Sequence, residues 1–585
     1  MCNSHSSSEV VQSGTSLLVQ DEAAKRKAEA HARAESVASA HSDIRIVNGR
    51  VHDPINNIDG ELRDVCIRDG KIVADVGADA QRIDAHGMVI LPGGIDMHSH
   101  IAGPKVNMAR RMMLEDHRHD AHPRHAHMRS GTGGAVPSTF ATGYRYAMLG
   151  YTTVMDAAVP PLGARQALQE LHDTPIVDKG FFILMGNNQL LFKLIKEGRR
   201  AEIRDMVAWW LNATKGYTTK LVNPGGVEMW KRGNRNITGM DEEVDGFGVT
   251  SRQIIQALAE AVNGLGLPHP IHLHCNNLGV TGNYTTTLDS MRSLAGQRAH
   301  MAHIQFHSYG GKAGGRPTSK AKEIAEYVNE HPEVSADVGQ VMFGQAVTMT
   351  ADAPVSYMLH KITGNTWINS DVEQESGCGI MPFVYQDKNY VHALQWGIGL
   401  ELFLLSKDPW RMVLSTDHPN GGSFLSYPRL IRLLMDREFR NEQIRSVNQA
   451  AMKRTQLLDN LEREYTLQEI TIITRAGPAK LLGLKDKGHL GVGADADITI
   501  YEMKDDKEAM FSTPRYVIKD GHVIIEDGEF RAETQGRVLH VAPAYDADIE
   551  HVIRPFFDEF YSMQYENYSV GDQYLRKHQV VACHG

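Results

Sequence analysis

Six side chains that can bind a metal ion or move a proton occur in apolar segments of this sequence, nearly all of them where a segment ends. Imidazole and carboxylate groups are common ligands of zinc and related divalent cations. A carboxylate beside such cations can also accept a proton from water. If the fold brings the six together, the set indicates metal-assisted hydrolysis. They are His98, His100, Lys220, His274, His303 and Asp417.

The motif Asp-Met-His-Ser-His places His98 and His100 two residues apart after an apolar run that ends in Leu-Pro-Gly-Gly. Side chains alternate along a strand, so both imidazoles project to one face. On an inward face, the two histidines can chelate one metal ion.

Later apolar segments carry several histidines each, and we rank them by distance from the predicted strand end. His274 lies closer to the carboxyl end than His272, so we expect His274 to be a ligand and His272 to lie behind it. On the next segment we prefer His303. There, His300 is expected to be structural, and His307 lies too far past the strand end to be the first choice.

Lys220 lies inside a segment predicted to be buried on both faces, in Thr-Thr-Lys-Leu-Val-Asn. A buried lysine must be paired or lose its proton. A neutral amine can add carbon dioxide to form a carbamate, an anionic group able to bridge two cations. The alternatives are a lysine paired with a carboxylate and a lysine that points outward.

The order of predicted elements favours an α/β fold, a (β/α)8 TIM barrel, because strand-like and helical patterns alternate through the middle of the chain. Active sites of such barrels lie at the carboxyl ends of the strands, where nearly all of the six side chains fall. The predicted strands are 88–100, 152–159, 180–185, 218–225, 270–276, 300–307, 334–341 and 411–419.

Both ends of the chain alternate apolar and polar residues between Asn-Gly and Asp-Gly turns, which predicts a small β-sandwich domain built from the two ends together. The barrel carries two segments too long for ordinary connections. The predicted parts are a flexible extension 1–42, the composite β-domain 43–90 with 485–545, the catalytic barrel 91–484 with insertions 101–151 and 342–410, and a tail 546–585.

Composition excludes several classes of protein. The 585 residues include 61 Lys and Arg against 71 Asp and Glu, a formal net charge of −10, which argues against nucleic acid as a partner. No apolar run is long enough to cross a membrane, and the amino-terminal residues lack the apolar core of a secretory signal. The 5 cysteines are scattered, so we expect a cytoplasmic protein without a disulfide framework.

The 29 histidines include a dense charged run between His117 and His127. It has no regular chelate spacing, so we interpret it as a solvated or partner-facing loop.

The pattern of ligands resembles the amidohydrolase superfamily, especially its dihydroorotase and hydantoinase-like branch. Longer strings, among them LPGGIDMHSHIAGPKVN, KLVNPGGVEMW, HIQFHSYGG and STDHPNGG, resemble the A-type polypeptides of formylmethanofuran dehydrogenase and of the bacterial formyltransferase/hydrolase complex. This resemblance extends over almost the whole chain from Asp43 onward.

The resemblance implies a site of two zinc ions held by the six residues, with Lys220 carboxylated and Asp417 moving the proton. The implied reaction is hydrolysis of an N-formyl bond on a furfurylamine carrier, methylofuran in aerobic methylotrophs or methanofuran in methanogens. The implied partners are the B-type and C-type polypeptides and the D-type formyltransferase of such a complex.

Substrate contacts are predicted from position alone. Lys105 and Arg145, with Arg110 and Arg111 nearby, lie on the first insertion and carry charges suited to an acidic carrier tail. Ordinary surface or interface charge is the alternative for each of these four. Asn276 and Gln305 lie beside ligand strands and are expected to orient the formyl group or the ligands.

Three other functions remain open. They are condensation of formate with methanofuran by the A-type polypeptide of formylmethanofuran dehydrogenase, hydrolysis of a cyclic amide in the manner of hydantoinase or dihydroorotase, and a non-catalytic scaffold role.

Overall fold

The computed structural model describes residues 43–113, 119–122, 124, 126–233, 236–312, 314–369, 379–458 and 461–584. The predicted extension 1–42 and part of the histidine run, including His117 and His125, lie outside these residues.

Eight parallel strands form the central sheet, in the order in which they occur along the chain. The first and last strands meet through a parallel bridge between Ser99 and His418, and the His100 amide donates to the His418 carbonyl at 2.8 Å. The sheet therefore closes on itself, which confirms the predicted barrel. The strands are β8 (Gly94–Ser99), β11 (Tyr151–Val159), β12 (Asp178–Leu184), β13 (Thr219–Val222), β14 (Ile271–His274), β15 (Ala299–Met301), β18 (Val334–Asp337) and β22 (Met412–Val413).

The first predicted strand, 88–100, is divided between two sheets. Its first half, β7 (Met88–Pro92), pairs with β2 (Arg50–Asp53) and β23 (Ile498–Glu502) outside the barrel. The chain passes into β8 at Gly93, where a Cβ atom would lie 2.2 Å from Thr152 Oγ1. This close approach lets one continuous apolar segment serve two cores.

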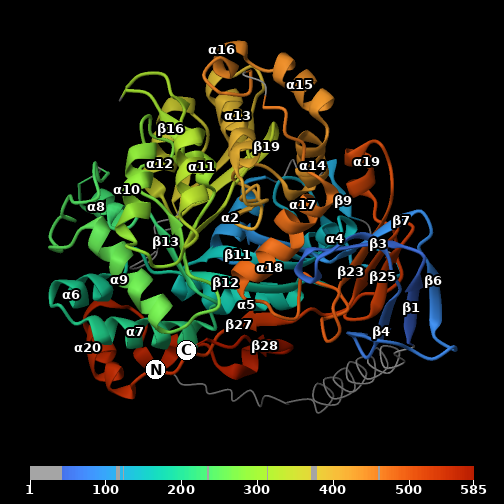
Figure 1. Ribbon diagram of the computed structural model, residues 1–585. Coiled ribbons are helices and arrows are strands. Elements are labelled where there is room, and N and C mark those ends of the chain that lie inside the picture. The colour runs from blue at the N-terminus through green and yellow to red at the C-terminus, as the bar shows by residue number, and fades with distance from the viewer. Residues whose placement is uncertain are drawn as a thin grey trace, which may run out of the picture.

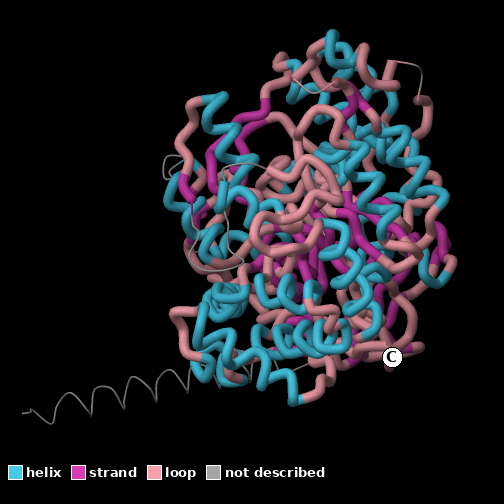
Figure 2. The backbone as a smooth tube through the Cα atoms, turned by 90° about the vertical axis from the view of Figure 1, so that its left-hand side faces the viewer, coloured by secondary structure: helices cyan, strands magenta, loops and turns pink. Residues whose placement is uncertain are grey.

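Helices cover the outside of the barrel (Figure 2). Helix α9 illustrates their origin: Thr250 and Gln253 form a capping box at its start, and Ile254, Ile255 and Leu258 form its buried stripe. The principal helices are α5 (Ala164–Asp173), α6 (Gln189–Lys196), α7 (Arg200–Thr214), α8 (Gly226–Gly233), α9 (Ser251–Gly264), α10 (Tyr284–Ser293), α11 (Ala321–Glu330), α13 (Tyr390–Leu405), α14 (Tyr427–Met435), α15 (Arg437–Ser446), α17 (Leu467–Thr471) and α18 (Gly477–Leu482).

A separate β-rich part combines strands from both ends of the chain, as predicted, and these blue and red segments lie side by side at the right of Figure 1. One sheet has the order β26-β25-β24-β23-β7-β2-β3 and the other β5-β4-β1-β6. Their remaining strands are β1 (Ile44–Val47), β3 (Ile58–Leu62), β4 (Val65–Arg68), β5 (Lys71–Val73), β6 (Gln81–Asp84), β24 (Tyr516–Lys519), β25 (His522–Glu526) and β26 (Glu529–Phe530).

The carboxyl-terminal segments pack against the barrel as well. Strand β27 (Val538–His540), which lies within the 485–545 segment, pairs with barrel strand β12 and with β28 (His578–Val580). Helices α20 (Glu550–Phe560) and α21 (Tyr565–Tyr568) follow, and the aromatic rings of α21 stack on Trp209.

The two long insertions form structured elements at the mouth of the barrel. The first holds α2 (Pro104–Met112), β9 (Ala121–His122), β10 (Gly131–Thr132) and α4 (Thr139–Met148). The second holds a small antiparallel sheet of β19 (Gly344–Thr350), β21 (Gly379–Tyr385) and β20 (Ile368–Asn369), with α12 (Ala353–Thr363). Apolar residues of α2, β19 and β21 share one core, so the two insertions support each other.

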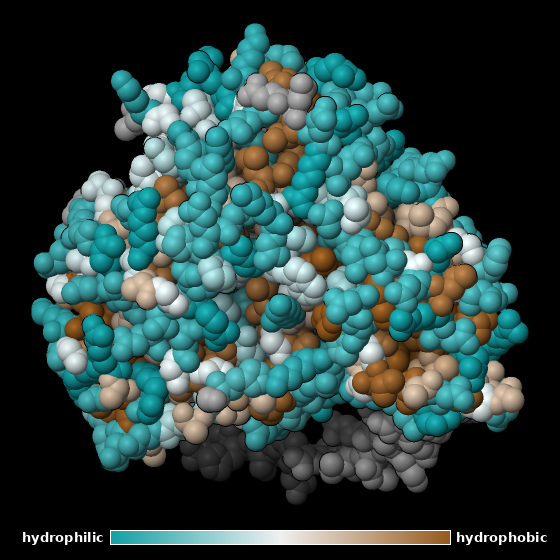
Figure 3. Space-filling model, viewed as in Figure 1, coloured by the Kyte–Doolittle hydropathy of each residue, from teal (hydrophilic) through white to brown (hydrophobic). Residues whose placement is uncertain are grey.

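The face shown in Figure 3 is mainly hydrophilic, with apolar residues in scattered areas. Within the described part of the chain, no helix combines the length and apolar character needed to span a membrane.

Candidate active site

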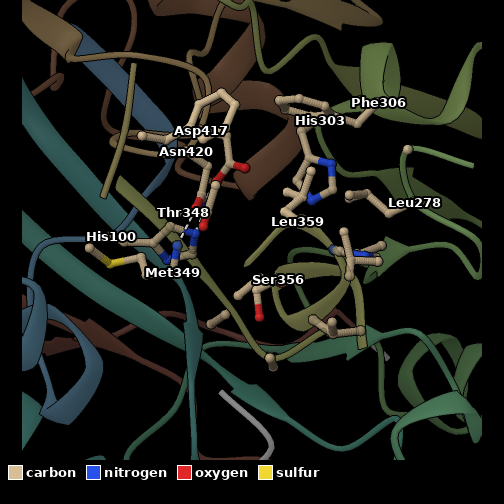
Figure 4. Close-up of a pocket in the computed structure, with 18 of the residues that line it drawn as sticks. His100, Leu278, His303, Phe306, Thr348, Met349, Ser356, Leu359, Asp417 and Asn420 are labelled. Carbon is tan, nitrogen blue, oxygen red and sulfur yellow. Dashed lines mark hydrogen bonds and ion pairs between the residues drawn. The ribbon is translucent and has the colours of Figure 1, made fainter. Parts of the chain in front are cut away.

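The structure gathers the six predicted chemical residues around one cavity at the carboxyl ends of the barrel strands, beside the second insertion. Figure 4 labels three of them, His100, His303 and Asp417. The cavity has a volume of about 160 Å³. Its walls are largely apolar, with side chains from η3 (Ile304–His307), β19, α12 and β21. The six that line it are His98, His100, Lys220, His274, His303 and Asp417.

Two of these residues adopt left-handed backbone conformations. The φ angle is +34° at His303 and +50° at Asp417, a region that non-glycine residues seldom adopt. A Cβ atom on Gly339, which has φ of +64°, would lie 2.2 Å from the His303 Cβ. Strained backbone held by close packing is characteristic of functional sites, and here it turns both side chains toward the cavity.

His98, His100 and Asp417 meet directly. Asp417 Oδ1 lies 3.1 Å from His98 Nε2 and 3.0 Å from His100 Nε2. Burial raises the pKa of Asp417, but the electrostatic effect of His98 and the hydrogen bonds from His98 and His100 outweigh it, so this pKa lies well below its ordinary value. Asp417 is therefore an ionised carboxylate at neutral pH, able to accept a proton or bind a cation.

Lys220 is 1% exposed, and its Nζ has no hydrogen-bond partner among the residues that the structure describes. Burial lowers its pKa to about 7, so a large share of the amine is neutral at physiological pH. No described carboxylate lies at hydrogen-bond distance, as the ion-pair alternative requires. An unpaired, partly neutral amine facing a cavity favours the carbamate interpretation over the ion-pair alternative.

The donor set fits divalent metal ions. Ligand atoms of His98, His303 and Asp417 all lie within 4.8 Å of one another. Burial holds the pKa values of His274 and His303 well below the ordinary value, so their imidazoles are neutral, as metal ligands must be. Nδ1 of His303 has no hydrogen-bond partner in the described structure. The chain thus offers neutral imidazoles, a carboxylate and a reactive amine around one point.

Three carboxylates orient the histidines, and none of the three was predicted from the sequence. His98 Nδ1 donates to Asp337 Oδ2 at 2.8 Å, His274 Nε2 lies 3.2 Å from Asp352 Oδ2, and Asp156 Oδ1 lies 3.5 Å from His100 Nδ1. Asp337 ends β18 and so carries the same signal that identified Asp417. Asp156 lies in the apolar β11, where a charged residue is conspicuous. Asp352 lies in the second insertion, and no pattern in the sequence identifies it.

Substitution of Asp337 tests this supporting role. The variant Asp337→Asn keeps the shape of the side chain but loses the charge that fixes the tautomer and orientation of His98. We expect metal affinity or activity to fall by about 10- to 100-fold, the usual effect of losing such a partner. Metal titration and steady-state kinetics measure the two quantities. An unchanged metal affinity with unchanged kinetics would show that Asp337 only fills space.

The low pKa of Lys220 predicts how pH changes stability. An unfolded lysine keeps its proton up to about pH 10, whereas folded Lys220 releases it near pH 7. Lys220 therefore destabilises the metal-free chain most at pH 7 and below, and the effect fades as pH rises toward 10. We expect Lys220→Met to raise the unfolding free energy by about 2 kcal/mol at pH 6 and by less at pH 9. Urea unfolding in bicarbonate-free buffer measures this, and an equal gain at both pH values would contradict it.

The predicted substrate contacts lie in different places. Lys105 is buried, lines the cavity and places Nζ 3.1 Å from His100 Nδ1. Arg145 pairs with Asp120 at 2.5 Å and does not line the cavity. Asn276 donates to the Asn223 side chain and the Pro224 carbonyl. Gln305 is buried with neither side-chain polar atom hydrogen-bonded in the described structure.

The other histidines and arginines considered as candidates do not line the cavity. His272 lies one layer deeper, with Nε2 3.1 Å from His98 Nδ1, and His300 contacts Asp337 there. Arg110 is buried and bonds to the Pro137 and Ile101 carbonyls, whereas Arg111 is exposed. Of the histidine run, His119 and His127 are exposed.

Comparisons with known proteins match this chain along most of its length. The model of the amidohydrolase family matches residues 81–525. Protein FwdA of Methanocaldococcus jannaschii is 45% identical over 559 residues, covering 92% of this chain and 98% of the relative. The A-type polypeptide of the formyltransferase/hydrolase complex Fhc of Methylorubrum extorquens is 39% identical over 537 residues, covering 90% and 96%.

A solved structure agrees with these relatives. The crystal structure of the formyltransferase/hydrolase complex FhcABCD from Methylorubrum extorquens, in complex with methylofuran, contains a chain that is 38% identical to this one. The match has a TM-score of 0.88 and covers 93% of this chain and all of the other.

Proposed function

The chain belongs to the amidohydrolase family, in the group that contains Protein FwdA and the A-type polypeptide of the Fhc complex, and from this premise we propose that it hydrolyses the N-formyl bond of formyl-methylofuran to formate and the free amine. The observation that carries the reaction class is the convergence of four histidines, one aspartate and a buried unpaired lysine on a single cavity. The carrier is inferred from the relatives.

Two zinc ions would be held by His98, His100, His274, His303, Asp417 and a carbamate on Lys220. Such a pair lowers the pKa of water and polarises a carbonyl oxygen. The carbamate forms when neutral Lys220 Nζ attacks carbon dioxide and releases a proton, and its negative charge offsets that of the cations. Asp337 and Asp156 hold His98 and His100 in the orientation that binding requires.

Asp417 is the proton carrier of the reaction. It accepts a proton from the water that attacks the formyl carbon, because it is ionised and at the cavity wall. It then donates this proton to the nitrogen of the tetrahedral intermediate, since an amine leaves poorly as an anion. The C–N bond breaks, and the neutral amine and formic acid are released. Formic acid then gives its proton to water and leaves as formate.

The remaining wall suits a formylated furfurylamine. Phe306, Met349, Val355, Leu359 and Phe383 give the cavity apolar sides that would exclude water and pack against a furan ring. Lys105 brings a positive charge to the wall, where it would attract a formate oxygen.

We also propose that the chain works within a complex, with partners of the B, C and formyltransferase D type. The support is its 0.88 TM-score to a chain of the FhcABCD complex.

A second candidate reaction is the reverse one, condensation of formate with methanofuran. The higher identity to the archaeal FwdA, 45% against 39%, favours this candidate, and the same residues serve both directions.

Incubation with competing amides tests the proposal. Zinc-loaded protein, alone and with copurified partners, is given N-formyl carrier, dihydroorotate or hydantoin, and product formation is followed. We expect release of formate from the carrier and negligible ring opening. Robust turnover of either cyclic amide would assign the chain to the cyclic amidases, and no turnover of any substrate by metal-loaded complex would favour the scaffold alternative.

A further inference from the structure

His307 is a buried histidine that the proposed mechanism does not use. It is fully buried, and neither ring nitrogen has a hydrogen-bond partner among the residues that the structure describes. Buried polar groups in proteins are nearly always paired, so an imidazole with both nitrogens free calls for an explanation.

The backbone brings His307 back to the site. Strand β15 is short and ends at Met301, and the four-residue turn η3 begins directly after His303. The left-handed backbone at His303 and this turn bring the His307 ring against that of His303, and the two rings stack with centroids 5.4 Å apart. A strand over the predicted range 300–307 would have carried His307 away.

The neighbours of His307 are themselves candidate metal ligands. Its ring lies edge-on to that of His274, with centroids 5.1 Å apart. Ligand atoms of His274, His303 and His307 all lie within 4.8 Å of one another. Such a cluster of three imidazoles matches the donor number of a typical zinc site with one open position.

His307 does not line the cavity, although His274 and His303 do. A substrate contact is therefore a poor explanation for it. We infer that His307 is a metal ligand, completing with His274 and His303 a three-imidazole position for one cation of the pair. His98, His100 and Asp417 then form the other position, and the inference rests on the proposed function in assuming a cation pair at this cavity.

The two positions differ in charge as a result. The position at His98 contains a carboxylate, Asp417, whereas the position at His274 is formed by imidazoles alone. The cation at the second position therefore keeps more of its positive charge and relies more on the Lys220 carbamate. We expect it to be the more weakly held of the two.

Metal binding by the full chain tests the assignment without any substrate. The variants are His307→Ala and the control His540→Ala, which removes another buried histidine on β27, far from the site. Zinc content after dialysis against a graded chelator gives the affinity of each position. X-ray absorption at the zinc edge gives the mean number of imidazoles per metal ion.

We expect wild type and His540→Ala to hold two zinc ions. His307→Ala should retain one tightly and bind the second more than about 100-fold more weakly, a larger loss than removal of an outer partner produces. Added imidazole should restore binding of the second zinc ion, because it can occupy the space left by the His307 side chain and bind the metal in its place. Two ions of wild-type affinity, or weaker binding with an unchanged imidazole count at full loading, would overturn the assignment.

This outcome is independent of the reaction. If the wild-type protein binds two ions and fails to hydrolyse the formyl carrier, the proposed function fails while the His307 assignment stands. If it hydrolyses the carrier and His307→Ala keeps both ions, only the His307 assignment fails.

Discussion

The variant Asp417→Asn is expected to lower kcat for formyl-carrier hydrolysis by about 10⁴-fold. Positioned acid–base catalysis contributes about 10²- to 10⁴-fold, and Asp417 is proposed to be a metal ligand as well. Asparagine keeps the size of the side chain and one oxygen. It cannot accept the proton of the attacking water, nor can it give the amine a proton at neutral pH.

The measurement is steady-state formate release at saturating carrier, with thermal unfolding to check the fold. Asp241→Asn is the matched control, since Asp241 is exposed and pairs with Arg252 on the outer surface. We expect this control to keep wild-type kcat. A kcat for Asp417→Asn within tenfold of wild type would remove Asp417 from the proton path.

The variant Lys220→Ala is expected to lose at least about 10³-fold in activity, since the proposed carbamate would bind both cations and offset their charge. Alanine leaves a space where the lysine side chain was. A short carboxylate such as propionate can enter it and supply the missing anionic oxygens. We therefore expect millimolar propionate to restore part of the activity.

Lys220→Arg distinguishes a requirement for the carbamate from a requirement for a positive charge at this position. Arginine keeps its proton at all accessible pH values and cannot add carbon dioxide. We expect it to be as inactive as alanine and insensitive to propionate, because its side chain fills the space. Activity of Lys220→Arg near that of wild type would show that the cation, not the carbamate, matters at this position.

The barrel was predictable because its signal is local. Alternating apolar strands and helices repeat through the middle of the chain, and polar side chains at strand ends mark one edge of the sheet. Residues such as His98 and Asp417 are placed by two-residue alternation or by the strand end itself. The eight strands and the β-rich part built from both ends follow from the same signals.

What could not be predicted depends on contacts between distant segments. Asp352 reaches His274 from the second insertion, and no sequence pattern links the two. The turn η3 depends on the left-handed conformation of His303, which the close approach of Gly339 permits. Without knowledge of that turn, the sequence predicts only that His307 lies beyond the strand end. Arg145 is the opposite case. Its charge predicted a contact with the substrate, but in the folded protein it pairs with Asp120.

The central claim, that this cavity holds two cations bridged by a carboxylated lysine, is tested most directly by anomalous diffraction at the zinc edge from crystals of the zinc-loaded protein grown with bicarbonate. The account predicts two anomalous peaks, one beside His98 and His100 and the other beside His274 and His303, with a carbamate on Lys220 Nζ between them. A single peak, a peak away from these histidines, or an unmodified amine at Lys220 would contradict it.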